Sequence, residues 1–340
     1  MNTMAPRLEW VDTLKGISIV LVVFYHATLM LAALDFEVEE LTYINRFLAP
    51  IRMPAFFFAA GLFARSAINK SWKDVFQHKV ALYMYLFVLW SVIRYIYFGI
   101  VPNPNTPTEG HNIFWLLQSV IKPVSGAWFL WSLSIFFLAT RALRGIPPLL
   151  VVVVASVLSA VTLSDVLRLH FSYENTLQYF IFFYSACQYR EIFQTITERK
   201  WSSVILGAVV FLLVTAAALI SRRWWVDGAA LFIAAWSGVF VMAGIAQFIT
   251  GTRLAKSFIY IGLNTLPIYV IHVMIVATIA HVADISGVPD EGDGVLIFPL
   301  ISTLLAIPIC LLLFKIATYA QQSWWLFKLP FAQRVEAIAR

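Results

Sequence analysis

Charged side chains are scarce in this chain of 340 residues. Asp, Glu, Lys and Arg together make up 12% of the sequence, whereas 61% of the residues are hydrophobic. Soluble domains carry about 25% charged and about 45–50% apolar residues. So few charges could not cover a water-facing surface of this size. The composition therefore excludes a soluble protein and indicates one that lies in the lipid bilayer.

Cysteine is also rare, and groups of metal ligands are missing. Cys187 and Cys310 both lie in apolar segments, which excludes a disulfide framework and a zinc-ligand motif. No pair of histidines or carboxylates has ligand spacing, so we expect no metal and no bound cofactor. The net charge of +6 is spread over short loops rather than clustered, so we expect no nucleic-acid partner.

Long apolar runs take up most of the sequence. Backbone polar groups in hydrocarbon must be paired within their own segment, so these runs are expected to be helices of roughly 20 residues. The predicted fold is all-α, a polytopic bundle of about ten transmembrane helices. The first run has no clear cleavage pattern, so we interpret it as a retained helix. The predicted spans are residues 16–34, 47–63, 80–101, 126–139, 146–163, 177–189, 204–220, 228–249, 258–282 and 295–319.

The basic residues predict how the bundle is oriented. If the N-terminus is inside, 17 of the 24 Lys and Arg residues fall in inner segments and seven in outer ones. This distribution obeys the positive-inside rule and places both termini in the cytoplasm. We expect a multi-pass protein of the cell inner (plasma) membrane. The loops are short, so residues 1–340 form a single domain; one longer outer connection, 102–125, contains a predicted interfacial helix at 111–121.

The first predicted helix carries a polar stripe. Asp12, Lys15, Ser18 and His26 follow the spacing that keeps side chains on one helical face. At about 1.5 Å per residue, His26 lies roughly 16 Å beyond Lys15 along the axis. Ionisable groups in membrane helices usually face the protein interior or a watery cavity. A histidine there can accept a hydroxyl proton, which suits acyl transfer from a thioester, although plain helix anchoring and packing stay open.

Further polar residues lie in other predicted spans. Arg52 and Arg94, near outer helix ends, either meet an anionic or sugar ligand or extend to the lipid headgroups. His272 lies five residues after Pro267, which is expected to loosen the helix there. Both a binding role and a packing role are open for His272. Asn264 is expected to satisfy carbonyl groups freed by the proline.

These residues resemble the motifs of a known family. Asp12, Lys15, Gly16 and His26 are similar to the first-helix motif of the acyltransferase 3 family, multi-helix membrane O-acyltransferases that modify sugars and glycans. In that family ten residues separate a basic residue from the histidine, as they separate Lys15 from His26. Three later segments resemble further family motifs in the expected order: RMPAFFFAAG at 52–61, AWFLW at 127–131 and IGLNTLPIYVIH at 261–272.

The resemblance implies a reaction and its participants. The donor is an acyl-CoA such as acetyl-CoA, a co-substrate on the cytoplasmic side, and the acceptor is a hydroxyl of a carbohydrate or similar molecule. His26 is then the general base or a transient acyl carrier, and Lys15, with Asp12, binds the donor. The candidate acceptor-binding residues are Trp128, His272 and Asn264 in these motifs, together with the outer arginines Arg52 and Arg94.

Two other classes of function remain open from the sequence. A secondary transporter of a small polar or anionic solute fits the number of spans equally well, although we find no inverted repeat and no paired broken helices. A structural or assembly protein would leave the polar stripe of the first helix unexplained. Oligomeric state is not indicated by the sequence.

Overall fold

The computed structural model describes residues 8–36, 38–123, 126–197, 200–220, 223–287, 293–319 and 323–330. These ranges are largely helical and contain no strand, which confirms the predicted all-α membrane bundle. The longer helices are α1 (Glu9–Ala32), α2 (Glu39–Leu62), α5 (Ala81–Phe98), α7 (Trp128–Ala142), α8 (Pro148–Leu163), α9 (Phe171–Gln188), α11 (Lys200–Ile220), α12 (Trp224–Ile249), α13 (Arg253–Leu263), α14 (Thr265–Ile285) and α15 (Asp293–Tyr319). Shorter turns are α3 (Arg65–Ile68), α4 (Trp72–Val75), the π-helical η1 (Phe76–Val80), α6 (Ile113–Ser119), η2 (Leu143–Gly145), α10 (Arg190–Thr197) and η3 (Trp324–Leu326).

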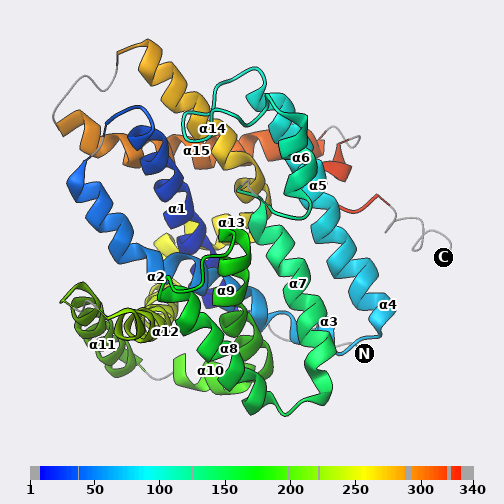
Figure 1. Ribbon diagram of the computed structural model, residues 1–340, viewed down its shortest axis with the longest axis vertical. Helices are drawn as coiled ribbons and strands as arrows, with labels where there is room; N and C mark the ends of the chain where they lie inside the picture. Colours follow the sequence, from blue (N-terminus) through cyan, green and yellow to red (C-terminus); the bar gives the residue numbers. More distant parts are fainter. Residues whose placement is uncertain are drawn as a thin grey trace.

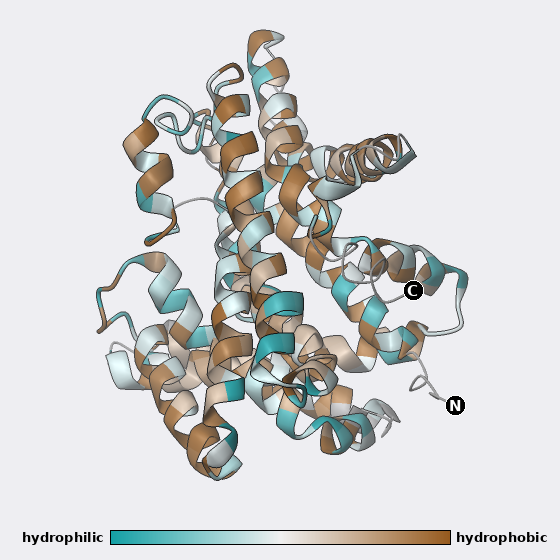
Figure 2. Cartoon of the chain, turned by 90° about the vertical axis from the view of Figure 1, so that its right-hand side faces the viewer, coloured by the Kyte–Doolittle hydropathy of each residue, from teal (hydrophilic) through white to brown (hydrophobic). Residues whose placement is uncertain are grey.

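Several helices are long and apolar enough to cross a membrane by themselves. In the described part of the chain there are five, namely Glu9–Ala32, Trp72–Phe98, Trp224–Ile249, Thr265–Ile285 and Gly294–Tyr319. Figure 2 shows hydrophobic residues predominating along the long helices. Every run predicted from the sequence falls mainly on helical structure, and the predicted helix at 111–121 contains the shorter α6, Ile113–Ser119. The described residues contain more helices than the ten predicted spans. Short helical turns lie in several connections, and one predicted span is divided into two helices. The first and last few residues, 1–7 and 331–340, lie outside the described ranges.

Helix α1 occupies the middle of the bundle. It packs against α2, α12, α13, α14 and α15, whereas α11 packs chiefly on α12. Figure 1 shows α1 running through the interior and α11 at the periphery. Val11, Leu14, Val23 and Ala27 of α1 are fully buried. The central position of α1 therefore places its polar stripe inside the protein, as the spacing predicts.

Two glycines let α1 and α13 cross at backbone contact. A Cβ at Gly16 would overlap the carbonyl oxygen of Phe258, and one at Gly262 would overlap that of Asp12. Each helix therefore presents a glycine to the backbone of the other. Small residues of this kind allow membrane helices to approach closely. The crossing fixes the half of α1 that carries Asp12 and Lys15.

The predicted single span at 258–282 is wrong, because the chain breaks at Asn264. Its φ of −109° and ψ of 26° are not helical, and α13 ends there while α14 begins at the next residue. The Asn264 side-chain amide donates to the Tyr260 carbonyl at 2.8 Å, which caps the end of α13. Pro267 lies in the first turn of α14, where a missing N–H costs little. The proline therefore starts a helix rather than loosening one.

Candidate functional site

A cavity of about 450 Å³ lies between α1, α2, α5, α9 and α14, beside the 102–125 connection. We call it the outer cavity because it lies at the end predicted to face outward. Its lining includes Tyr25, His26, Arg52, Arg94, Glu109 and Trp128. Side chains from distant parts of the sequence therefore meet at the polar stripe of α1.

The side-chain hydrogen bonds that the structure describes for His26 all involve one ring nitrogen, Nδ1. Its Nδ1 lies 2.9 Å from the carbonyl oxygen of Val22 and 3.3 Å from Nε2 of His272. Nδ1 of His272 lies 2.7 Å from the Tyr269 carbonyl oxygen. A carbonyl only accepts, so this network assigns the proton to Nδ1 in both rings. No hydrogen bond reaches His26 Nε2 from the residues that the structure describes, and a Cβ placed on Gly126 would lie 4.0 Å from it, in the outer cavity.

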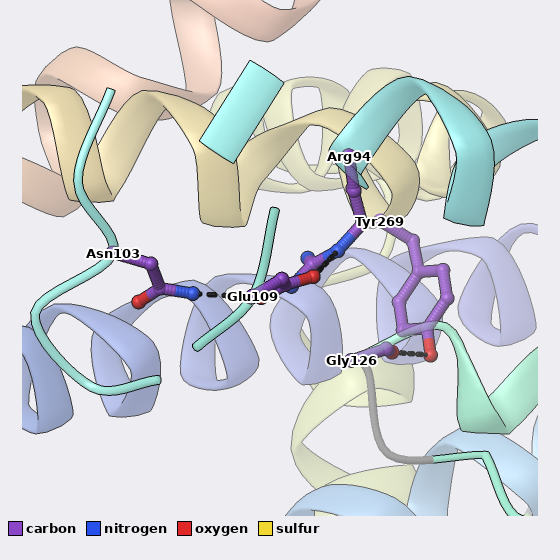
Figure 3. A network of polar contacts seen from close by, with 5 residues as sticks. All are labelled: Arg94, Asn103, Glu109, Gly126 and Tyr269. Atoms are coloured by element: carbon purple, nitrogen blue, oxygen red, sulfur yellow. Dashed lines mark hydrogen bonds and ion pairs between the residues drawn. The ribbon is translucent and has the colours of Figure 1, made fainter. Parts of the chain in front are cut away.

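Arg94 is held in a buried polar network, drawn in Figure 3. Its Nε and Nη2 donate to the two carboxylate oxygens of Glu109 at 3.0 and 2.9 Å, and Asn103 donates to the same carboxylate at 2.8 Å. Arg94 and Glu109 are 5% and 2% exposed. Such a two-pronged pair fixes the guanidinium and neutralises its charge.

Arg52 has a different environment. Its Nη1 donates to the Asn45 side-chain oxygen at 2.8 Å and its Nη2 to the Asn45 carbonyl at 3.3 Å. The guanidinium carbon lies 4.1 Å from the centre of the Tyr25 ring. Arg52 is 6% exposed and lines the outer cavity, so its guanidinium lies among protein side chains.

Aromatic rings form one side of the outer cavity. Trp128 and Tyr179 both line it and stack on each other, with ring centres 6.0 Å apart and planes inclined by 29°. Phe57 stacks on Tyr179 at 5.5 Å. These contacts hold the Trp128 ring at the cavity wall, where a flat apolar surface can pack against a ligand ring.

A second cavity, of about 270 Å³, lies nearer the predicted cytoplasmic end. We call it the inner cavity; its lining includes Lys15, Phe63, Lys79, Phe129, Thr265 and Tyr269. Lys15 forms an ion pair with Asp12 at 2.8 Å and lies 5.3 Å from the centre of the Phe63 ring. Among the lining residues that the structure describes, two are lysines and none is a carboxylate. The inner cavity therefore presents two cationic groups, one of them paired with Asp12, beside apolar rings.

Tyr269 separates the two cavities. Its hydroxyl donates to the Gly126 carbonyl, as Figure 3 shows, and accepts from the backbone N–H of Phe129 at 3.2 Å. Gly126 lines the outer cavity, whereas Phe129 and Tyr269 line the inner one. The tyrosine ring and the start of α7 therefore form the wall between them.

The predicted site residues fall into distinct places. His26, Arg52, Arg94 and Trp128 line the outer cavity, and Lys15 lines the inner one. Asp12 contacts Lys15, and His272 contacts His26 rather than either cavity. Asn264 lines neither cavity and bonds within its own helix. The roles of these residues remain predictions.

Several residues of the site were missed by the sequence reasoning, among them Glu109, Asn103 and Tyr269. Glu109 is the one acidic residue in the 102–125 connection, a signal that could have marked it as the partner of an outer arginine. Asn103 lies between two prolines at the start of the same connection. Tyr269 lies within the recognised segment 261–272, but nothing in the sequence distinguishes it from other aromatic residues. In the described ranges no three His, Cys, Asp or Glu side chains come together as metal ligands.

Comparison with known proteins gives one match. The acyltransferase 3 family model, described as an acyltransferase domain, matches residues 8–315, which include both cavities and every predicted site residue. No curated protein and no solved structure shows significant similarity to the chain. Because the match extends over nearly the whole chain, the protein belongs to the acyltransferase 3 family of membrane acyltransferases.

Proposed function

We propose that this acyltransferase transfers an acetyl group from acetyl-CoA to a hydroxyl of a glycan or similar acceptor, with His26 as the base. The observation that carries the proposal is the state of His26. Its Nδ1 is held by Val22 and His272, and its Nε2 has no hydrogen-bond partner among the described residues and lies beside Gly126 at the outer cavity. A base must reach the proton that it removes, and Nε2 is the one basic atom of His26 in that position.

The transfer proceeds by exchange at the acyl carbon. An acceptor hydroxyl in the outer cavity gives its proton to His26 Nε2 while its oxygen bonds to the thioester carbonyl carbon. The carbon–sulfur bond then breaks, and the proton passes from Nε2 to the leaving thiolate. The products are an ester and free CoA. In the alternative, His26 itself takes up the acyl group before the hydroxyl does, and Nε2 is again the reacting atom.

His272 supports the charged form of His26. When Nε2 takes up the proton, the ring becomes a cation whose Nδ1–H remains bonded to the Val22 carbonyl and to His272 Nε2. Two acceptors at one N–H stabilise the positive charge and hold the ring plane. His272 is therefore a positioning residue, since it touches His26 and not the cavity.

The donor occupies the inner cavity on this proposal. CoA carries several phosphate charges, which Lys15 and Lys79 attract, while the apolar rings of the lining accept its less polar arm. Asp12 holds the Lys15 ammonium in place. The thioester must then pass the wall formed by Tyr269, so this ring moves aside during each turnover. Donor and acceptor thus approach His26 from opposite ends.

The acceptor occupies the outer cavity. Trp128 offers a flat face for a sugar ring, and the polar side chains around it offer partners for hydroxyl groups. A site in the inner (plasma) membrane, open at its outer end, gives access to acceptors outside the cytoplasm.

The test is direct measurement of the acyl group. Purified protein in lipid nanodiscs is incubated with acetyl-CoA labelled in the acetyl group, with and without a mixture of glycans. Acceptor-dependent release of CoA and labelled ester supports the proposal. Uptake of solute into sealed vesicles without consumption of acetyl-CoA would instead indicate a transporter.

A further inference from the structure

We propose that the acceptor carries an anionic group, a carboxylate or a phosphate, which binds Arg52 in the outer cavity. The inference rests on the proposed function in one respect, namely that the outer cavity receives the acceptor. It is carried by the contrast between the two arginines of that cavity. One has a buried carboxylate partner and the other has none among the residues that the structure describes.

Arg94 is not available to an anion. Glu109 accepts two hydrogen bonds from it, at 3.0 and 2.9 Å, and both side chains are almost fully buried. Asn103 adds a third bond to the carboxylate at 2.8 Å. The pair is electrically neutral as a unit, and an incoming anion would meet the negative charge of Glu109 beside it.

No carboxylate among the described residues balances the charge of Arg52. Its bonds to Asn45, a neutral amide, use two of the five guanidinium N–H groups. The guanidinium carbon lies 4.1 Å from the centre of the Tyr25 ring, which attracts the cation but supplies no negative charge to balance it. A buried charge without a counter-ion is costly, so a ligand that supplies the counter-ion gains affinity.

The surroundings of Arg52 fit an anion in the cavity. Tyr25 and Tyr179 line the same cavity, and a phenol hydroxyl can donate to an anionic oxygen. Trp128 stacks on Tyr179, so a ring packed on Trp128 would place its substituents close to this group. A planar guanidinium fork matches a carboxylate or phosphate better than an ammonium does.

The anion has two sources. It is either a substituent of the acceptor sugar, as in a uronic acid, or a phosphate that joins the sugar to a lipid carrier. In both cases the anionic group of the acceptor binds Arg52, and a nearby hydroxyl of the acceptor faces His26 Nε2. A different role for Arg52, stabilising the negative oxygen of the reacting carbonyl, would lower the maximal rate and leave acceptor affinity unchanged.

The experiment measures binding separately from transfer. Thermal shift and tryptophan fluorescence report the affinity of protein in nanodiscs for p-nitrophenyl glucuronide and for p-nitrophenyl glucoside, which differ at the C6 group. A second pair, glucose 6-phosphate and glucose, tests phosphate on a sugar. Nanodiscs that contain a polyprenyl phosphate sugar test the lipid-linked source.

We expect the charged member of at least one pair to bind about tenfold tighter or more than its neutral counterpart, since hydrogen bonds to charged groups have that magnitude. For the lipid-linked source, the comparison is with nanodiscs that contain the same sugar linked to the polyprenol without phosphate. Arg52→Gln should abolish the preference, and Arg52→Lys should retain part of it. Arg46→Gln is the control, an exposed arginine of the same helix, and should behave as the parent. If Arg52→Gln fails to fold, the comparison is made with Arg52→Lys.

The outcomes separate the two proposals. A charge preference that depends on Arg52, without any acetyl transfer, would support the anion site and count against the proposed function. Transfer with no preference for any of the charged probes, or a preference that survives in Arg52→Gln, would overturn the anion site alone. A lower maximal rate with unchanged affinity for every probe would also overturn it, in favour of a role at the reacting carbonyl.

Discussion

At the scale of single residues, the site depends on which nitrogen of His26 holds the proton. The i−4 carbonyl of Val22 is available to Nδ1 because the ring lies back along its own helix. His272 makes the equivalent bonds to Ile268 and Tyr269 within α14. Each histidine is therefore held by its own helix. His26 Nδ1 lies 3.3 Å from His272 Nε2, and the proton between them is on His26.

The first prediction concerns His26. His26→Ala should lower transfer about 100- to 10,000-fold, because a positioned general base contributes that much. Activity of the parent should also fall on acidification, since a protonated ring cannot accept the hydroxyl proton. Initial rates with labelled acetyl-CoA provide the measurement. His281→Ala, a histidine on α14 outside both cavities, should keep the parent rate. A His26→Ala protein that transfers at nearly the parent rate would show that the stripe is structural.

The second prediction concerns Lys15 in the inner cavity. Lys15→Ala should raise the apparent KM for acetyl-CoA with a smaller effect on kcat, because the ammonium attracts the donor's phosphates and does not touch the acyl carbon. Lys15→Arg should be tolerated. Steady-state kinetics with varied donor, at saturating acceptor, separates the two parameters. An unchanged KM in Lys15→Ala would remove the lysine from donor binding.

The third prediction concerns the buried pair of Arg94 and Glu109. Glu109→Gln leaves a buried cation without its counter-ion and should destabilise the protein by about 3–5 kcal/mol. Glu191→Gln is the matched control, because the Arg65–Glu191 pair is exposed, and its loss should cost at most about 1 kcal/mol. Chemical denaturation in detergent measures both. Similar small effects in the two variants would mean that water or lipid headgroups already screen Arg94.

At the scale of the helices, backbone contact between α1 and α13 positions the inner cavity. Gly16 and Gly262 each face the other helix with no room for a side chain. The break at Asn264 then redirects the chain, so that α14 carries His272 to His26 while α13 remains on the inner half of α1. One continuous span could not make both contacts.

The fourth prediction concerns this crossing. Gly262→Ala should destabilise the protein by about 1–3 kcal/mol, because the new Cβ overlaps the carbonyl of Asp12 and the helices must separate. Gly145→Ala is the control, since nothing lies within 4 Å of its Cβ position. Melting temperatures in detergent provide the comparison. Equal melting temperatures for both variants would contradict the close packing.

At the scale of the whole molecule, two cavities lie toward opposite ends of one bundle and share a wall. The outer one contains arginines and aromatic rings, and the inner one contains lysines and apolar rings. Tyr269 and the start of α7 keep them apart. On the proposed function, the donor enters at one end of the bundle and the acceptor at the other.

The fifth prediction tests that orientation. Asn105→Cys in the outer cavity should react with a membrane-impermeant maleimide added to intact cells, whereas Lys79→Cys in the inner cavity should react only after the membrane is opened. Cys187 and Cys310 are buried, so the background should be low. Labelling of both positions from the same side would contradict the predicted topology.

The sequence by itself determined the helical membrane fold, the family and the polar face of α1. Long apolar runs permit only helices in hydrocarbon, and the spacing from Lys15 to His26 fixes their common face whatever the neighbours are. The positions of most helices were predictable from the apolar runs for the same reason. These features depend on residues that are close together in the sequence, so one sequence is enough to predict them.

Only the tertiary structure decided which polar groups meet. The pairing of Arg94 with Glu109, the contact of His272 with His26 and the exclusion of Asn264 from both cavities depend on residues far apart in sequence. The break at Asn264 was also not predictable from the sequence. Close packing through Gly16 and Gly262 fixes how α13 crosses α1, and the chain changes direction at Asn264, where α14 begins. Apolar periodicity carries no information about such contacts, since lipid and neighbouring helices are equally apolar surroundings.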